Sequence, residues 1–257
     1  MHDYDISTYG DAFADLYDEA HPATAEVSAA VSLLSGLAGG GQVLELGIGT
    51  GRIALPLAAT GLAVHGIESS AAMIDRLKAK AGAEKVSVTQ GNFADIAAER
   101  EYSLIFVTFN TFWMLLDQEE QVRCCASVAR ALRPGGVFVV EGSMPDVNVL
   151  AKTRSVEGTA MSGTSVTIDV TIRDTVSQRI DRQQLIVGKE GIRLHPLSFR
   201  YVWPAELDLM ARLAGMRLRA RYADWNHETF GPRSRHHVSV YALASDEPGQ
   251  DEPGAPA

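Results

Sequence analysis

The sequence predicts an α/β protein built on a doubly wound, mostly parallel sheet of seven strands. Short apolar segments alternate with helical patterns through the first half of the chain. Most of these segments are apolar on both faces, as strands of a parallel sheet covered by helices are. Beyond residue 141 the helical patterns stop, and β segments of alternating polarity predict an antiparallel β insertion after the fifth strand. The five apolar segments are 42–46, 63–67, 85–89, 103–108 and 136–141.

Two helices are expected before the first strand. Residues 8–19 carry aromatic and leucine side chains at helical spacing, which predicts an amphipathic helix. Tyr9 and Tyr17 are separated by about 2.2 helical turns, so their side chains lie on nearly the same face. The second helix covers 22–37, and three consecutive glycines at 39–41 end it.

The second half of the chain predicts the insertion and then the end of the main sheet. A turn at 188–191 separates two of the insertion's β segments, which predicts antiparallel pairing on the main sheet. Pro204 opens a further helix over 205–214, and Gly215 ends it. The tail, 245–257, is acidic and rich in proline and glycine, a composition typical of disorder. The insertion segments are 164–176, 182–188 and 192–203, and the closing strands are 216–223 and 236–243.

Composition and charge exclude several classes of protein. Hydrophobic residues make up 46% of the 257 residues, which allows one large domain with a sizeable core. The formal net charge of −9 argues against a nucleic-acid partner, since such a partner requires a basic face. Arg217, Arg219 and Arg221 alternate along an expected strand, and we interpret them as sharing one solvated face.

Neither export nor membrane insertion is predicted. The first residues are acidic where an export signal is basic, and no apolar stretch reaches the ~18 residues of a spanning helix. Cys124 and Cys125 are neighbours on an expected helix and lack the spacing of a disulfide or metal pair. These observations predict a cytoplasmic protein without a membrane partner.

A glycine-rich loop follows the first strand and is flanked by two acids. Glu45 precedes the Gly47-x-Gly49-x-Gly51 loop, and Glu68 stands at the end of the next strand, where nucleoside ligands bind in such sheets. A dinucleotide fingerprint reads G-x-G-x-x-G, and Arg52 stands where that pattern has its last glycine. A carboxylate repels a pyrophosphate, whereas it forms a charge-assisted hydrogen bond with the ammonium of S-adenosylmethionine (SAM). The charge at Glu45 therefore favours SAM, with the ribose hydroxyls on Glu68.

The order of these motifs resembles the class I SAM-dependent methyltransferases over about residues 5–243. Gly91-Asn92-Phe93 is similar to the family's adenine-contacting segment, and 132–136 is similar to its turn before the fifth strand. Many relatives have Asp at position 92, but the amide oxygen of Asn92 can also accept from the adenine amino group. The resemblance implies SAM as cofactor and S-adenosylhomocysteine (SAH) as product. The residues implied to bind the cofactor are Tyr17, Glu45, Gly47, Gly49, Gly51, Arg52, Glu68, Ser69, Met73, Asn92, Phe93 and Phe109.

The carboxyl end of the fourth strand is expected to lie beside the SAM sulfur. Aromatic side chains that follow it, Phe109 to Trp113, can stabilise a cationic centre there by ~0.5–2 kcal/mol. The alternatives are core packing for the aromatic residues and helix capping for Asn110. The resemblance implies that the N-terminal helix folds over the cofactor through Tyr17, and the alternative is a helix that only packs by its aromatic side chains. The candidate catalytic residues are Tyr9, Tyr17, Asn110 and Phe112.

We expect three parts in the chain: an N-terminal helical lid (1–38), a SAM-binding α/β domain (39–244) that contains the insertion (152–203), and the tail. In the family, a β insertion at this place covers the acceptor pocket or forms a subunit interface. Both alternatives stay open, and the second would make a homo-oligomer. The loop 224–234 mixes aromatic and polar residues, as acceptor-binding loops do. Acceptor contacts are expected from Tyr9, Phe112, Trp113, His195, Arg200, Tyr201, Trp203, Trp225 and Arg235.

No metal is expected, because the adjacent His236 and His237 lack a companion acid and ligand spacing. The resemblance is strongest to bacterial small-molecule N-methyltransferases of antibiotic biosynthesis, of the aminosugar or lincosamide type. It implies a small-molecule amine as acceptor. The first alternative is an O-methyltransferase with a histidine base, for which His195 is a candidate. The second is a non-catalytic SAM-binding regulator or scaffold, which the complete glycine loop and both acids argue against.

Overall fold

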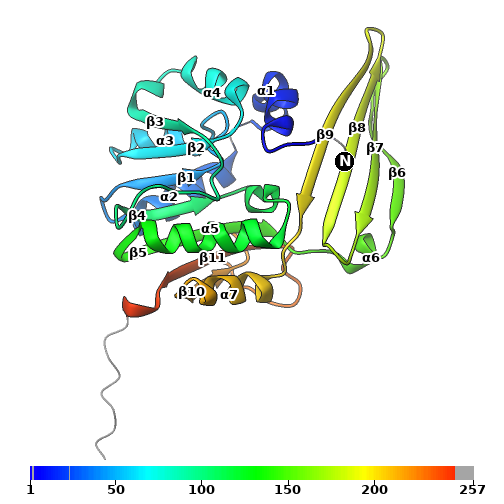
Figure 1. Cartoon of the computed structure of the whole chain (residues 1–257). Coiled ribbons are helices and arrows are strands. Elements are labelled where there is room, and N and C mark those ends of the chain that lie inside the picture. The colour runs from blue at the N-terminus through cyan, green and yellow to red at the C-terminus, as the bar shows by residue number, and fades with distance from the viewer. Residues whose placement is uncertain (2, 23, 247–257) are drawn as a thin grey trace, which may run out of the picture.

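The computed structural model describes Met1, residues 3–22 and residues 24–246, which form two β-sheets with helices around the larger one (Figure 1). The larger sheet has seven strands in the order β10-β11-β5-β4-β1-β2-β3. The strands from β5 to β3 pair in parallel, and β11 pairs antiparallel with both β5 and β10. This confirms the predicted doubly wound, mostly parallel sheet. The predicted disordered tail lies outside the described residues from position 247 onward.

The strands of the larger sheet are β1 (Val43–Leu46), β2 (Val64–Glu68), β3 (Val86–Gln90), β4 (Tyr102–Val107), β5 (Leu132–Ser143), β10 (Met216–Tyr222) and β11 (His236–Leu243). The helices are α1 (Thr8–Ala20), α2 (Ala25–Ala38), α3 (Ala54–Ala59), α4 (Ala71–Lys78), α5 (Gln118–Ala131), α6 (Val147–Leu150) and α7 (Pro204–Leu213). Short 3₁₀ turns lie at η1 (Ala83–Lys85), η2 (Thr111–Met114) and η3 (Ala244–Asp246). The expected helices and main-sheet strands are therefore present.

Helices cover both faces of the larger sheet, so its central strands are buried on both sides. In β4, Leu104 and Phe106 pack into the core on the α2 and α3 side, and Ile105 and Val107 pack on the α5 and α7 side. The strand β3 is an edge strand with half-exposed and exposed residues, so the expectation of two apolar faces does not hold there. An edge strand has a neighbouring strand on one side only, which explains why β3 is more exposed than the central strands.

The insertion forms a sheet of its own instead of extending the larger sheet. Its four antiparallel strands are β6 (Arg154–Met161), β7 (Ser165–Asp174), β8 (Arg179–Gly188) and β9 (Gly191–Arg200). The expected antiparallel pairing is present, but β6 was not predicted. Seven of its eight residues are exposed, so β6 carries no pattern of burial that could reveal a strand. Figure 1 shows this sheet beside the larger one, with α1 on the side that faces it.

The two faces of the insertion sheet differ. Phe13 of α1 packs on His195 of β9, on the face toward the larger sheet. The opposite face exposes apolar side chains, among them Val156, Ile172 and Leu194, which are 71%, 51% and 57% exposed. Within the described residues no segment covers these three side chains, and the homo-oligomer through this sheet stays a prediction.

The shared arginine face on β10 was a wrong prediction. A bulge between Leu218 and Ala220 shifts the register against β11. Arg217 therefore pairs opposite Ala242 and Arg221 opposite Ser239, which lie on opposite faces of that strand. Arg221 donates to Asp208 and to the hydroxyls of Ser239 and Tyr241. Instead of a solvated basic stripe, Arg221 holds β10 to α7.

No helix within the described ranges is both long and apolar enough to cross a membrane.

Cys124 and Cys125 are buried free thiols on α5, as their adjacent positions suggested.

Gly66 of β2 should not tolerate a side chain. An added Cβ would lie 2.4 Å from Cδ1 and 2.6 Å from Cβ of Ile48, whose backbone forms the glycine loop. We expect Gly66→Ala to lower the free energy of unfolding by ~1–3 kcal/mol through overpacking, as measured by urea denaturation. The matched control is Gly36→Ala in α2, where a Cβ meets nothing within 4 Å. It should raise the same quantity by ~0.5–1 kcal/mol, and equal effects of the two changes would contradict this packing.

Candidate functional site

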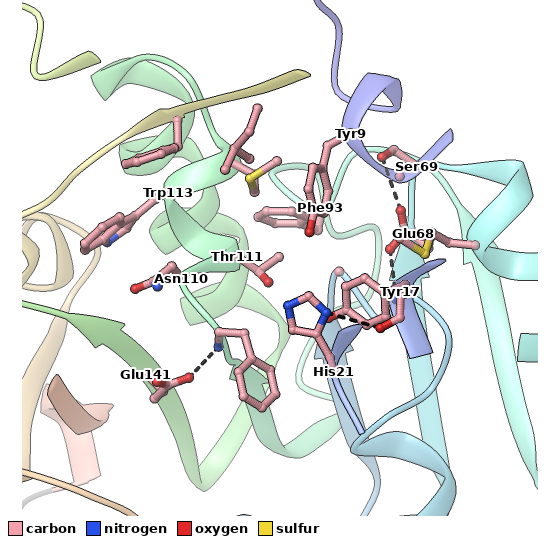
Figure 2. A pocket seen from close by; sticks show the side chains of 18 of the residues that line it. Tyr9, Tyr17, His21, Glu68, Ser69, Phe93, Asn110, Thr111, Trp113 and Glu141 are labelled. Atoms are coloured by element: carbon pink, nitrogen blue, oxygen red, sulfur yellow. Dashed lines mark hydrogen bonds between the residues drawn. The ribbon is translucent and has the colours of Figure 1, made fainter. Parts of the chain in front are cut away.

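A cavity of about 480 Å³ lies at the carboxyl ends of β1, β2, β4 and β5, between the larger sheet, α1 and the insertion sheet (Figure 2). Residues of the larger sheet, of α1 and of the insertion sheet all contribute to its wall. Of the predicted site residues, the structure brings eleven to this cavity: Tyr9, Tyr17, Gly47, Gly49, Glu68, Ser69, Met73, Phe93, Phe109, Asn110 and Trp113.

Glu68 closes the carboxyl end of β2 and holds the glycine loop. Its Oε2 accepts from the backbone N–H of Gly49 at 2.9 Å, and its Oε1 accepts from the backbone N–H of Ser70 at 2.9 Å. Burial raises the pKa of Glu68, and these backbone donors counteract that rise. Oε1 also accepts from Ser69 Oγ at 3.4 Å, and Oε2 keeps a lone pair that can accept from a ligand hydroxyl. The predicted ribose contact is therefore sterically and chemically suited to this position.

The glycine loop passes the cavity at Gly47 and Gly49, and the two positions differ in the room around them. Gly47 has φ +70°, and a Cβ there would lie 2.3 Å from Cγ2 of Thr111. Gly49 has φ +54°, and a Cβ there would project into open space. Both values lie in the left-handed region that favours glycine. A nucleoside ligand can thus approach the backbone at Gly49 closely.

Glu45 does not occupy the place that the sequence predicted for it. It lies beneath the loop on the α3 side, 4% exposed, and accepts from the backbone N–H of Ala54 at the start of α3. Burial raises the pKa of Glu45 well above its usual range. Residues of a strand alternate in direction, so Glu45 shares the buried face of Val43. The expected contact with a ligand ammonium is therefore corrected to a support of the α3 end of the loop.

Two further cofactor predictions also fall outside the cavity wall. Asn92 uses its Oδ1 to accept from Ala94 N at 2.9 Å, and its Nδ2 donates to Glu120 at 3.3 Å, so it stabilises its own turn. Gly51 lies against Leu77, on the α4 side of the loop. Phe93 alone of the adenine segment faces the cavity. The contact predicted for Asn92 is corrected accordingly.

Arg52 lies behind Phe109, with its guanidinium carbon 4.0 Å from the ring centroid. Its Nε is buried and has no hydrogen-bond partner in the described part of the chain. Burial of a charged donor without a partner is costly, so an anionic ligand group close to Arg52 would be stabilising. A contact of Arg52 with the cofactor stays a prediction.

Three acidic residues on one side of α1 hold this helix over the glycine loop and α4. Asp11 accepts from Ser70 Oγ at 2.5 Å, and Asp18 accepts from Thr50 Oγ1 at 2.6 Å and from Lys80 Nζ at 2.8 Å. Asp15 forms an ion pair with Arg76. We call Asp11, Asp15 and Asp18 the α1 clasp. It sets Tyr9 and Tyr17 against the cavity, where burial raises the pKa of both, that of Tyr17 to about 12.

The segment after β4 is held in an uncommon backbone conformation. Phe109 and Asn110 have φ of +54° and +60°, in the left-handed region that non-glycine residues rarely adopt. The Asn110 side chain accepts from Ser143 N at 2.6 Å and donates to Ser143 Oγ at 3.1 Å. Asn110 is also the residue before the turn η2, as the capping alternative expected, but it makes no side-chain cap bond. Its side chain instead ties β4 to β5.

Glu141 lies at the end of β5 and faces the cavity (Figure 2). Its Oε2 accepts a short hydrogen bond from the backbone N–H of Phe109, and the residue is 5% exposed. Burial raises the pKa of Glu141 to about 7, further raised by Glu26 and lowered by Arg52 and the Phe109 N–H. Glu141 was not among the predicted site residues, although its place at the carboxyl end of an expected strand was a usable signal.

Other residues of the cavity were also missed. Arg182, Leu197 and Phe199 come from the insertion, and Phe199 stacks on Trp113 with ring centroids 5.8 Å apart. The remainder come from α1 and the residues that flank it, from α2 and η2, and from the ends of β5 and β11. Nothing in their local sequence shows that they converge. They are Ile6, Gly10, His21, Glu26, Thr111, Met114, Ser143 and His236.

Several acceptor predictions are corrected by the structure. Phe112 and Tyr201 are buried in the core on the α5 side, Trp203 packs against it, and Trp225 is buried on the α2 side. Apolar packing therefore explains these four. Arg200 is buried and donates to Gln121, to Gln178 and to Glu206, the last at 2.6 Å. It joins β9 to α5 and α7 instead of meeting a ligand.

His195 and Arg235 are also outside the cavity wall. His195 is 8% exposed, and the ring of Phe13 meets it edge-on at 5.3 Å between centroids. His195 is not among the residues that line the cavity, so its predicted role as the base is corrected. Arg235 is exposed, and its backbone carbonyl accepts from Met144 N. Among the described residues no three His, Cys, Asp or Glu side chains are grouped as a metal site requires, and the metal-free site stays a prediction.

Comparisons with known proteins agree with this geometry. A methyltransferase domain family matches residues 43–136, from β1 to the start of β5. The structure of the CcbJ methyltransferase from Streptomyces caelestis is 41% identical, with 94% of this chain and 100% of that chain covered and a TM-score of 0.87. The cypemycin N-terminal methyltransferase of a Streptomyces species is 28% identical, covering 78% of this chain and 82% of that protein. The sugar N-methyltransferase KedS8 from a Streptoalloteichus species, at 20% identity, 93% and 98% coverage and a TM-score of 0.63, shares the fold.

Removal of the Glu68 carboxylate should weaken SAM binding. Glu68→Ala deletes the acceptor of the Gly49 and Ser70 N–H groups and of the ribose, and a hydrogen bond to a charged group contributes ~1.5–3 kcal/mol. Titration calorimetry should show affinity lower by about 10- to 150-fold. The exposed Glu99, changed to Gln, is the matched control and should leave the affinity unchanged. Unchanged affinity in Glu68→Ala would contradict the ribose assignment.

The α1 clasp should contribute to cofactor affinity in a salt-dependent way. The clasp contains two ion pairs, Asp15–Arg76 and Asp18–Lys80, and each partly exposed pair contributes ~0.2–1 kcal/mol. Changing Asp11, Asp15 and Asp18 together to Asn should therefore weaken SAM binding by about 2- to 30-fold at low salt. The wild type should approach the variant as salt is added, because screening weakens the same pairs. The control is Asp75→Asn, which removes an exposed acid of α4 that makes no bond to α1. An identical salt dependence in wild type and triple variant would contradict the clasp.

Proposed function

Because the chain belongs to the class I SAM-dependent methyltransferases, we propose that it transfers the methyl group of SAM to an amine nitrogen of a small-molecule natural product, an antibiotic or aminosugar precursor. SAM supplies an electrophilic methyl group on a sulfonium. The protein's own residues bind the two reactants, align them and exclude water, and no covalent enzyme intermediate is needed.

The end of the cavity near β1, β2 and β3 suits the cofactor. Glu68 would accept from the ribose hydroxyls, Gly49 leaves room for the nucleoside, and Phe93 offers a face to the adenine. Ser69, Met73 and Tyr17 complete this end of the cavity, and Tyr17 belongs to α1, the proposed lid. A ribose-binding acid is common to SAM and dinucleotide sites. Arg52 at the place of the last glycine of the dinucleotide fingerprint, together with the methyltransferase family match, supports SAM.

The other end of the cavity suits an acceptor with an apolar body. Tyr9 from α1, Trp113 from η2 and Phe199 from the insertion give aromatic faces around it. Asn110 offers polar contact beside them, and Arg182 adds one cation from β8. With α1 and the insertion sheet both against the cavity, we propose that residues 1–38 act as a lid and the insertion as a roof. Both would exclude water during the transfer.

The observation that carries the choice of an amine is the acidic wall of the cavity. Glu26 and Glu141 both line it on the α2 side, and a carboxylate there attracts an ammonium group. Aromatic faces next to them add attraction for a cation. The 28% identical relative is by name an N-terminal methyltransferase of cypemycin, which supports an amino group as acceptor.

A hydroxyl acceptor is the second candidate, and one observation favours it. His236 lines the cavity with its Nδ1 3.3 Å from Ser143 Oγ, so an imidazole is present as a base for a hydroxyl. His21, which stacks on Tyr17 at 4.6 Å between ring centroids, is a further imidazole on this wall. These histidines replace His195 in that role.

A panel of matched acceptors tests the proposal. We expect methyl transfer from labelled SAM to aminosugars and to cyclic secondary amines, and none to the compounds in which a hydroxyl replaces the amine. Liquid chromatography with mass detection would identify the methylated product, and SAH release would give the rate. Transfer only to hydroxyl compounds would establish the second candidate instead. Calorimetric binding of SAM without turnover on any acceptor would favour a non-catalytic role.

A further inference from the structure

We infer that Glu141 binds the acceptor nitrogen as an ammonium ion and removes its proton before methyl transfer. The inference rests on the proposed N-methyltransferase function and names the base that the sequence analysis left unassigned. Glu141 belongs to β5 and lies outside both the glycine loop and α1.

One oxygen of Glu141 is fixed and the other is available. The Phe109 N–H donates to Oε2, which orients the carboxylate at the end of the strand beside the expected methyl position. Oε1 makes no hydrogen bond to any described residue, and it is not among the fully enclosed polar atoms. Glu141 lines the cavity, so this oxygen can meet a bound ligand. A base needs this combination of a fixed orientation and one free lone pair.

Strain next to Glu141 indicates that the arrangement serves the site. Phe109 and Asn110 both have positive φ, a strained backbone conformation for residues other than glycine. This conformation turns the Phe109 N–H toward Glu141, and the Asn110 side chain clamps Ser143, two residues beyond Glu141. Two strand ends are thereby locked together around one carboxylate.

The charges around Glu141 keep it able to accept a proton near neutral pH. Glu26 of α2 disfavours its ionisation, and Arg52 behind Phe109 favours it. His236 of β11 lines the same cavity, and His237 lies near Gly142 on the other face with its pKa lowered to about 4 by burial. Tyr17 of α1 and His21, which directly follows α1, also line the cavity, as do Tyr9, Glu68 and Arg182. The raised pKa of Glu141, about 7, agrees with a carboxylate that exchanges a proton with an amine.

The proposed step balances as follows. The acceptor ammonium gives one proton to the Glu141 carboxylate, which becomes a carboxylic acid, and the nitrogen regains its lone pair. That lone pair forms the new N–C bond while the C–S bond of SAM breaks and its electron pair stays on sulfur, giving SAH. The product leaves as the methylated ammonium, and the carboxylic acid loses its proton to water. No oxidant, metal or further reactant is required.

Glu141→Gln separates a base from a purely structural residue, because the amide oxygen can still accept from the Phe109 N–H. With the amine of the panel that reacts fastest, we expect kcat/KM at pH 7.5 to fall by about 10²-fold or more, within the usual range for a general base. SAM affinity should stay within about threefold of wild type. The matched control is Glu84→Gln, an exposed acid in the turn η1 before β3, which should leave both unchanged.

The pH profile gives a readout that a structural role would not move. In the wild type the base is protonated below pH 7, so kcat/KM should fall as the pH drops through about 7. That limb should disappear in Glu141→Gln. Glu26→Gln removes a neighbouring negative charge, so the limb should move to lower pH. A Glu141→Gln enzyme with wild-type rate and an unchanged acid limb would overturn the inference while leaving the N-methyltransferase proposal intact.

A binding measurement decides the matter where no panel amine reacts. The SAH complex would be titrated calorimetrically with cyclohexylamine and with cyclohexanol, a charged and an uncharged ligand of the same shape. The wild type should prefer the amine by about tenfold or more, and Glu141→Gln should lose that preference. Equal binding of both ligands to the wild type, or an unchanged preference in the variant, would overturn the inference. Turnover of hydroxyl compounds alone would instead refute the proposed function.

Discussion

The buried carboxylate of Glu68 is the interaction on which the site depends. It accepts from Gly49 in the loop after β1 and from Ser70 at the start of α4, and the Ser70 hydroxyl donates to Asp11 of α1. One chain of hydrogen bonds thus joins three segments that are far apart in sequence, the helix α1, the glycine loop and the turn from β2 to α4. A carboxylate buried without such donors would cost several kcal/mol, so the loop, the strand end and the helix start must form together. The cavity takes its shape from that requirement.

The same part of the molecule was the most predictable from sequence. Strands buried on both faces carry continuous apolar runs, as in Ile105 and Phe106, and a glycine loop with positive φ permits few alternatives. Glu68 was predicted correctly as the acid at the end of the second strand. Glu45 was not, because the sign of its charge was considered and the direction of its side chain was not. Strand alternation from Val43 would have placed it on the α3 side.

The acceptor end could not be predicted in the same way, since its residues meet only through tertiary structure. Arg182 and Phe199 lie on an insertion whose position against α1 depends on long-range packing, and β6 has no apolar pattern that reveals it. Aromatic and basic residues such as Trp225 and Arg200 have the composition of a ligand site, yet core packing and an ion pair with Glu206 use them instead. Polar and aromatic residues that directly follow a strand predict a site better than similar residues in a long loop. Asn110 and Trp113 follow β4 and do line the cavity.

The helix α1 connects the two ends of the cavity and thereby relates the cofactor to the acceptor. Its acidic side binds the glycine loop and α4, while Phe13 on another side packs on His195 of the insertion. Tyr9 and Tyr17 lie between these contacts and face the cavity. A helix held by partly exposed ion pairs on one side and by ring packing on the other is attached less strongly than the buried sheet below it. In the proposed lid role, α1 would move to admit either ligand, and its return would cover both at once, because residues of the same helix line the cofactor end and the acceptor end.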